Sequence, residues 1–362
     1  MESRKKISKL FLVVLTVVIL SVVNFRILAC AAPAAAKPVK LLWATFTPPG
    51  DVSTETMQAF AEELKKRSGG RVEIELSLGG ALAPAPQLYD KLVAGACDMV
   101  FLMPYAVTGV FPYTEVTALP CVLPKAEAAT KAILSLFKKG YSDKAWDKVK
   151  FLWAFTGSGA VIYWRDKPAT TIAEFANKKI RTFSATQANA MSALGAVPVS
   201  MPVGECYGAL GKGTVDGMWA GYFSCIPFKW YEVAKYCTEM RMFAGLNCAA
   251  MNLDSYNKLP KDIQKIIDEM SYPNEKYWLE AAKKADAAED AGKKKFAEVG
   301  RIDQLAPGEL SKMEPLLAPI WTKWIADMEA KGLKPKEMLA EFYSSLKASG
   351  VEKPFVGYTP GH

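Results

Sequence analysis

Apolar and polar positions recur with two different periods along the chain, which predicts strands and helices in turn. Residues 39–46 form a dense apolar run typical of a buried strand. Apolar residues then recur at helical spacing, from a cap at Ser53 or Thr54 to a stop at Gly69 and Gly70. Residues 71–78 alternate between apolar and polar, as a half-buried strand does. This part of the chain is therefore predicted to be a β-α-β unit.

The same two periods continue to about residue 260. The predicted strands are 98–103, 151–155, 161–164, 179–183, 197–201, 215–220 and 249–251. The predicted helices are 87–94, 126–149, 185–194 and one that begins at 206–211. Strands that alternate with helices favour a mostly parallel sheet covered by helices. The fold class is therefore predicted to be α/β.

Two β-α-β regions, with a strand near 249–251 that returns to the first, predict two lobes joined by a hinge. After Pro260 the pattern becomes helical, over 262–295, 307–331 and 336–349. These last helices are predicted to brace both lobes while leaving bending possible. The expected boundaries are lobe I at 38–158 and 246–275, lobe II at 159–245, and C-terminal helices at 276–362.

The first 31 residues carry the features of a secretory signal peptide. Four basic residues precede a 14-residue apolar run from Leu10 to Val23, which is short for a membrane span. The signal peptide could be processed in two ways: at an Ala-x-Ala cleavage site that closes at Ala31, or at a loose lipidation box with Cys30 as the lipid-bearing residue. Simple cleavage is favoured. The sequence therefore predicts export to the periplasm, with lipid anchoring at Cys30 as the alternative.

Charge and cysteine content exclude several classes of protein. Without residues 1–31 the chain has 40 basic and 36 acidic residues, a net charge of about +4 that is too mild and evenly spread for nucleic-acid binding. Six cysteines remain, none in a C-x-x-C pair, which argues against zinc. Cys237 and Cys248 are the first pair to test for a disulfide, and buried free thiols are the alternative.

The single histidine is His362, the last residue. A Ser/His/Asp or Cys/His catalytic system needs an imidazole held inside a site, and a chain terminus does not hold one. No acidic cluster has the spacing of metal ligands. We therefore predict that the protein is not an enzyme and has no metal or cofactor. An exported lyase that uses carboxylates is the enzymatic alternative.

A set of short motifs occurs in a specific order along the chain: Gly69-Gly70-Arg71-Val72-Glu73-Ile74, Leu119-Pro120, Lys179-Ile180-Arg181, Leu194-Gly195-Ala196-Val197-Pro198, Glu205-x-Tyr207-x-Ala209-Leu210-x-x-Gly213-x-Val215-Asp216-Gly217, and Leu259-Pro260-x-Asp262-Ile263-Gln264. Together they resemble the DctP-type solute-binding proteins of tripartite ATP-independent periplasmic (TRAP) transporters, from about Lys40 to about Leu346. The resemblance implies a two-lobed periplasmic-binding-protein fold that closes on an organic acid, and the membrane subunits of a TRAP permease as partners.

The resemblance also implies a strand-borne arginine that binds the substrate carboxylate, and Arg181 stands at that position. The neighbouring residues support this role, because an arginine between Ile180 and Phe183 is costly to bury unless it meets an anion. Its planar guanidinium suits a carboxylate held by two hydrogen bonds. The alternative is an internal ion pair, with Glu205 as the first partner to test.

The sequence departs from the family pattern where many members carry a second arginine. Gly159 is followed here by Ala160 and Val161, and Trp219-Ala220 stands where a polar pair is common. A second carboxylate would lose its partner, so we expect a small monocarboxylate with an apolar or aromatic body, including 2-oxo acids. Aromatic residues at or near predicted strand ends are the other candidate ligand-binding residues. They are Trp219, Tyr222 and Phe183 first, then Phe46, Tyr105, Trp164 and Phe223.

The predicted function is capture of an organic acid outside the cytoplasm and its delivery to a TRAP permease. C4-dicarboxylate binding is one alternative. Another is a receptor whose ligand-loaded form meets a sensor protein, or the binding component of an ATP-driven transporter. Neighbouring genes for a small and a large membrane subunit would favour the TRAP system.

Overall fold

The structure is a computed structural model that describes residues 37–360. The fold described below is that of the compact unit that begins at Lys40. The predicted signal peptide, Cys30 and His362 lie outside the described residues. Within the described part, no helix combines the length and the apolar character that a membrane span requires.

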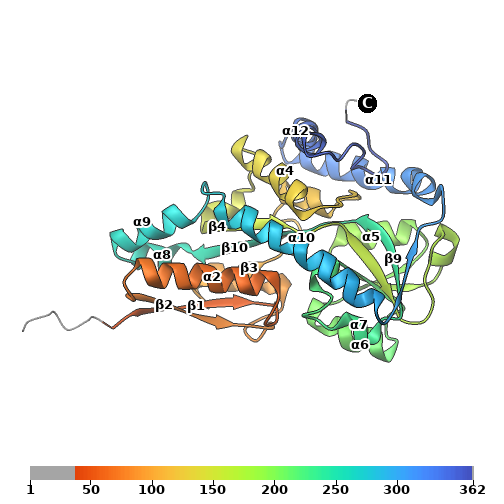
Figure 1. Ribbon diagram of the computed structural model, residues 1–362. Coiled ribbons are helices and arrows are strands. Elements are labelled where there is room, and N and C mark those ends of the chain that lie inside the picture. The colour runs from red at the N-terminus through yellow and green to blue at the C-terminus, as the bar shows by residue number, and fades with distance from the viewer. Residues whose placement is uncertain (1–36, 361–362) are drawn as a thin grey trace, which may run out of the picture. The chain divides into compact units, whose positions relative to one another are not determined.

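Eleven strands form two separate sheets in the described chain (Figure 1). The first sheet has the order β2-β1-β3-β10-β4 and the second has the order β11-β9-β5-β8-β6-β7. The strands are β1 (Val39–Thr45), β2 (Val72–Ser77), β3 (Met99–Leu102), β4 (Val149–Thr156), β5 (Ala160–Trp164), β6 (Lys179–Thr182), β7 (Val197–Ser200), β8 (Gly217–Ala220), β9 (Tyr236–Met242), β10 (Leu246–Asn252) and β11 (Arg301–Gln304). The predicted α/β class is confirmed.

The chain passes from the first sheet to the second between β4 and β5 and returns between β9 and β10. Each strand that brings the chain into a sheet runs antiparallel to both of its neighbours: β5 to β8 and β9, and β10 to β3 and β4. The remaining described pairs, such as β1 with β3 and β6 with β7, are parallel. Both sheets are therefore mixed, because a crossing strand arrives from the opposite direction.

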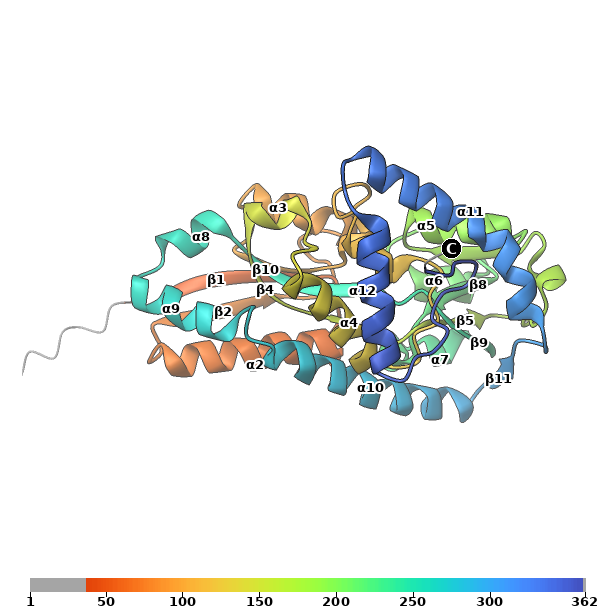
Figure 2. The same ribbon diagram turned by 90° about the horizontal axis from the view of Figure 1, so that it is seen from above.

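The α-helices of the described chain are α2 (Val52–Arg67), α3 (Leu88–Val93), α4 (Ala126–Lys138), α5 (Ala185–Ala193), α6 (Cys206–Lys212), α7 (Trp230–Val233), α8 (Leu253–Lys258), α9 (Lys261–Met270), α10 (Lys276–Ala297), α11 (Glu309–Ala330) and α12 (Pro335–Ala348). Helix α10 contacts α2, α4 and β4 beside the first sheet, and β11 and the short helix η7 (Tyr222–Ser224) beside the second. Figures 1 and 2 both show α10 extending along the two sheets. The predicted long C-terminal helices are thus present.

Three predicted helix boundaries are wrong, each for a local reason. Helix α2 is capped by Asp51, whose side chain accepts a hydrogen bond from Ser53 N, so the cap lies upstream of the predicted one. Helix α4 ends at Lys138 because Gly140 takes a left-handed conformation. The predicted helix over 262–295 is two helices, because Tyr272 N bonds to Leu152 O and Pro273 has no N–H to donate.

The second sheet buries both of its faces. Along β5, Ile162 and Trp164 join one apolar cluster while Val161 and Tyr163 join another, as the two-residue period of a strand requires. A third cluster packs around the first sheet. The sheets are therefore fixed frameworks from which loops at strand ends can hold a site.

The six cysteines of the described chain are buried free thiols. Cys237 and Cys248, the pair considered for a disulfide, lie on β9 and β10, which belong to different sheets. In this structure the free-thiol alternative therefore applies.

Candidate ligand-binding site

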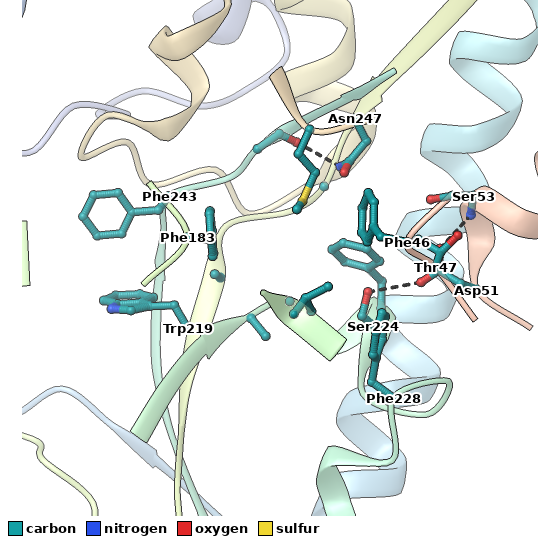
Figure 3. A pocket seen from close by; sticks show the side chains of 18 of the residues that line it. Phe46, Thr47, Asp51, Ser53, Phe183, Trp219, Ser224, Phe228, Phe243 and Asn247 are labelled. Carbon is teal, nitrogen blue, oxygen red and sulfur yellow. Dashed lines mark hydrogen bonds between the residues drawn. The ribbon is translucent and has the colours of Figure 1, made fainter. Parts of the chain in front are cut away.

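A cavity of about 70 Å³ lies between loops and strand ends of the two sheets (Figure 3). The segments that line it follow β1, β3 and β4 on the first sheet and β6 and β8 on the second, together with the β9–β10 crossing. Ligands of α/β proteins bind outside the carboxyl ends of strands, which is where this cavity lies. The lining residues used below are Phe46, Thr47, Asp51, Ser53, Tyr105, Arg181, Phe183, Trp219, Phe223, Ser224, Phe228, Phe243 and Asn247.

Arg181 is the one cationic side chain among the described residues that line this cavity. It is 3% exposed and forms no ion pair within residues 37–360. Its guanidinium donates from Nε to Met201 O at 3.2 Å and from Nη1 to Trp219 O at 3.5 Å. A guanidinium has five N–H donors, so three remain for another acceptor. Glu205 is exposed and does not pair with it.

Aromatic rings surround the guanidinium of Arg181. Its Cζ lies 5.0 Å from the centre of the Phe183 ring, and Phe183 packs edge-on against Tyr105 at 5.2 Å. Burial raises the pKa of Tyr105, while the charge of Arg181 opposes that rise. Tyr105 therefore keeps its proton and its hydroxyl is a donor. Phe183 comes from the second sheet and Tyr105 follows β3, so both sheets contribute to this end of the cavity.

Glycines in the cavity wall let aromatic rings approach the backbone. A Cβ on Gly245 would lie 2.3 Å from the Tyr105 ring, and a Cβ on Gly221 would lie 2.5 Å from the Phe223 ring. Real Cβ atoms do not approach so closely. The lack of a side chain at these two glycines therefore leaves the space that the Tyr105 and Phe223 rings occupy, and the rings in turn shape the cavity.

A polar group occupies the other end, formed by Thr47, Asp51 and Ser224 (Figure 3). Asp51 is 1% exposed; its Oδ1 accepts from Ser53 N at 2.9 Å and its Oδ2 accepts from Ser224 Oγ at 3.3 Å. Burial raises the pKa of Asp51, and its hydrogen bonds partly oppose the rise. Because Asp51 precedes α2 and Ser224 belongs to η7, this contact joins segments of the two sheets.

The structure brings six of the eight sequence-predicted residues to the cavity: Arg181, Trp219, Phe183, Phe46, Tyr105 and Phe223. Trp164 and Tyr222 do not line it. Trp164 donates to Thr238 Oγ1 at 2.8 Å inside one core cluster, and Tyr222 contacts Cys237 Sγ at 3.0 Å inside another. Residues that sequence reasoning missed are Thr47, Asp51, Ser53, Ser224, Phe228, Phe243 and Asn247.

Trp164 lies elsewhere because β5 is antiparallel to β8. Trp164 pairs with Gly217 at the start of β8, whereas Val161 pairs with Ala220 at its carboxyl end, beside the cavity. The first residue of β5, Ala160, lines the cavity instead. Among residues 37–360 there is no group of three His, Cys, Asp or Glu side chains placed to hold a metal ion.

Two sheets joined by two crossings, with a cavity lined from both, are typical of proteins that bind a small solute. The family model described as bacterial extracellular solute-binding protein, family 7 (DctP), matches residues 43–351. The chain belongs to this family. Its fold is the periplasmic-binding-protein fold of TRAP solute-binding proteins, and a member of this family is a binding protein and not an enzyme.

The comparisons with individual proteins agree. A TRAP solute-binding protein from Rhodoferax ferrireducens, solved with copurified benzoate, has a TM-score of 0.78 and 26% identity over 86% of this chain and 98% of that one. A marine metagenome TRAP solute-binding protein described as specific for aromatic acid ligands has a TM-score of 0.79 and 24% identity over 86% and 99%. The C4-dicarboxylate-binding periplasmic protein DctP of Rhodobacter capsulatus is 27% identical over 301 residues, 81% of this chain and 88% of that protein.

Proposed function

We propose that this TRAP solute-binding protein captures a small organic monocarboxylate with an apolar or aromatic body, 2-oxo acids included, and delivers it to the membrane subunits of a TRAP permease. The observation that carries the proposal is Arg181, which is buried, has no acidic partner within residues 37–360, and faces an aromatic cavity. A buried charge without a partner is costly. An incoming carboxylate would supply that partner.

Arg181 alone does not account for useful affinity. A hydrogen bond to a charged group contributes roughly 1.5–3 kcal/mol, whereas a micromolar dissociation constant requires about 8 kcal/mol. The remainder would come from apolar contact with Phe46, Phe183, Trp219 and Phe223, at roughly 25 cal/mol for each Å² buried. A ligand with a flat apolar body uses these walls, and a small polar acid does not. The benzoate held by the Rhodoferax relative supports this ligand class.

The relative named for C4-dicarboxylates makes a dicarboxylate the competing ligand. Against it, the cavity offers one cation, Arg181, so a second carboxylate would have no cationic partner among the described lining residues.

Delivery to a permease requires that the protein work outside the cytoplasm. We keep the proposal that residues 1–31 direct export to the periplasm, with cleavage after Ala31 favoured over a lipid on Cys30. Mass spectrometry of the exported protein distinguishes the two endings.

The test is thermal unfolding of residues 32–362, refolded to remove carried ligand, against aliphatic, aromatic and 2-oxo monocarboxylates and C4-dicarboxylates. Binding raises the apparent stability by about 2.7 kcal/mol at a hundredfold excess over the dissociation constant. We expect Tm to rise with monocarboxylates and the rise to vanish in Arg181→Lys, which keeps the charge but loses the planar guanidinium that forms two hydrogen bonds to a carboxylate. Arg301→Lys, at an arginine whose side chain is 63% exposed, is the matched control. Tighter binding of dicarboxylates, or binding indifferent to Arg181, would refute the proposal.

A further inference from the structure

The hydroxyl hydrogens at the Asp51 end of the cavity can be traced from their partners. Thr54 Oγ1 donates to Pro48 O at 2.9 Å, so its single hydrogen is used there. The 2.9 Å contact between Thr47 Oγ1 and Thr54 Oγ1 must then be donated by Thr47. The 2.8 Å contact between Thr45 and Thr47 must in turn be donated by Thr45. Thr47 therefore has no hydrogen left for a ligand.

Two further residues at this end, Asp51 and Ser224, also present acceptors, whereas the Ser53 hydroxyl, which lines the cavity too, has a hydrogen that it can direct to Asp51 or to a ligand. Ser224 Oγ donates its hydrogen to Asp51 Oδ2, and the Asp51 carboxylate has none to give. The 3.3 Å length of that contact is beyond the usual range for an O–H···O bond, so Oδ2 is weakly satisfied. Three oxygens, from Thr47, Asp51 and Ser224, thus face the cavity with lone pairs and without a free hydrogen.

Arg181 stands at the opposite side of the cavity. Its guanidinium lies against Phe183 and the carbonyl of Trp219. Figure 3 shows Phe183 and Trp219 on one side of the pocket and Thr47, Asp51 and Ser224 on the other. No ion pair joins Arg181 to Asp51 within the described chain, so neither satisfies the other. The space between them has a donor end and an acceptor end.

We infer that Asp51 is a specificity-determining residue, and that the ligand is an aromatic monocarboxylate with a hydroxyl or amino group at the end remote from its carboxylate. This inference rests on the proposed function, in which Arg181 binds the carboxylate. The remote group donates its hydrogen to Asp51 Oδ2, with Thr47 and Ser224 as neighbouring acceptors. Such a bond supplies the donor that a buried carboxylate requires. An acid that lacks the donor leaves Asp51 weakly satisfied, and a site built in this way rejects such analogues.

The alternative is a purely structural role, in which Asp51 serves only as the N-cap of α2. Asn caps a helix about as well as Asp does. Asp51→Asn therefore preserves the cap while removing the charge and replacing one acceptor with a donor. Asp51→Ser also preserves the cap and removes the carboxylate altogether. These two variants separate the role in helix stability from the role in ligand choice.

The experiment is calorimetric titration of the refolded protein with phenylacetate, its 3- and 4-hydroxy and 3- and 4-amino derivatives, and 4-carboxyphenylacetate. We expect at least one donor-bearing isomer to bind about tenfold or more tightly than phenylacetate, as a hydrogen bond to a charged group provides. The carboxy derivative should bind most weakly. In Asp51→Asn and Asp51→Ser the advantage of the best isomer should fall below about threefold, and the carboxy derivative should gain affinity.

Asp143→Asn is the matched control. Asp143 is 3% exposed and accepts bonds from Tyr113 and Thr114, but it does not line the cavity, so the ligand ranking should not change. If phenylacetate binds the wild type as well as every donor-bearing isomer, the inference is overturned while the proposed function stands. If the advantage survives in both Asp51 variants, the role given to Asp51 is wrong. If none of these acids binds while another monocarboxylate still raises Tm, the inference is overturned and the proposed function stands; if no monocarboxylate raises Tm either, the proposed function is overturned as well.

Discussion

Gly292→Ala tests whether the contact between α10 and η7 positions the ligand site. Gly292 lies inside α10, and a Cβ built on it would stand 2.0 Å from Tyr222 O and 2.8 Å from Tyr222 C. Both of these atoms are backbone, so no side-chain rotation relieves the overlap. Normal contact distances are about 3.5 Å, so α10 or η7 has to move by more than about 1 Å. The moving segment η7 carries Phe223 and Ser224 of the cavity.

Two effects of the substitution oppose each other, and their magnitudes decide the sign. Alanine is favoured over glycine inside a helix by about 0.8–1.0 kcal/mol. Overpacking costs typically about 1–3 kcal/mol, and a clash with rigid backbone belongs at the upper end. We expect a net loss of about 2 kcal/mol in the free energy of unfolding, which lowers Tm by several degrees. Because η7 moves, affinity for the ligand should also fall, by about tenfold.

The matched control is Gly208→Ala in α6, where an added Cβ meets no atom within 4 Å. Only the helix preference acts there, so Gly208→Ala should stabilise the protein by up to about 1 kcal/mol. The assays are thermal unfolding by circular dichroism and ligand titration. If Gly292→Ala is as stable as Gly208→Ala and binds ligand normally, the close approach of α10 to η7 does not position the site.

Two further predictions concern buried ionisable groups. Burial raises the pKa of Cys97 and Cys225 to about 11, so their thiols should resist a thiol reagent at pH 8 in the native protein. After unfolding without reductant, all six thiols in residues 32–362 should react with the reagent. A count of four reactive thiols would indicate a disulfide. Burial also raises the pKa of Asp51 above its usual 3.8, so the folded state binds its proton more tightly than the unfolded state. The free energy of unfolding of the wild type, measured with denaturant and without ligand and compared with that of Asp51→Asn, should therefore fall as the pH rises from about 3.8 through the raised pKa. An increase over this pH range would contradict the reasoning.

The place of Arg181 in the cavity could be predicted from sequence because the family resemblance indicated this position and because a cation there conflicts with its surroundings. Burying a cation between Ile180 and Phe183 in a strand costs free energy unless an anion pairs with it, and this cost can be recognised from the sequence alone. Asp51 carries no such conflict. An acid just before an apolar helix is common, and Ser53 and Thr54 beside it were the predicted caps, so the sequence position of Asp51 gave no sign of a cavity. A cap residue that also lines a cavity is recognised only once the facing segment, here Ser224, is in place.

The strands that sequence reasoning missed share a similar cause. Strand β9 carries Glu239 and Arg241, which suggest an exposed loop when the sequence is read alone. In the structure Arg241 pairs with Glu239 and with Glu289 of α10, and Lys293 of α10 also pairs with Glu239. The polar residues of β9 are thus covered by a helix about 50 residues further along the chain. A local period does not carry this information, because the partners meet only after α10 has packed.

The charge balance of the cavity decides between the two classes of acid. Phe183, which packs against Arg181, lies across the cavity from Asp51 (Figure 3), and the lining contains one cation and one carboxyl whose pKa is raised by burial. A monocarboxylate adds one negative charge at Arg181, where three N–H donors are free. A dicarboxylate of similar length adds a second at Asp51, whose own carboxylate repels it. An unpaired buried charge costs several kcal/mol, which is a large share of the 8 kcal/mol or so that micromolar binding requires. The cavity is therefore expected to bind dicarboxylates far more weakly than donor-bearing monocarboxylates.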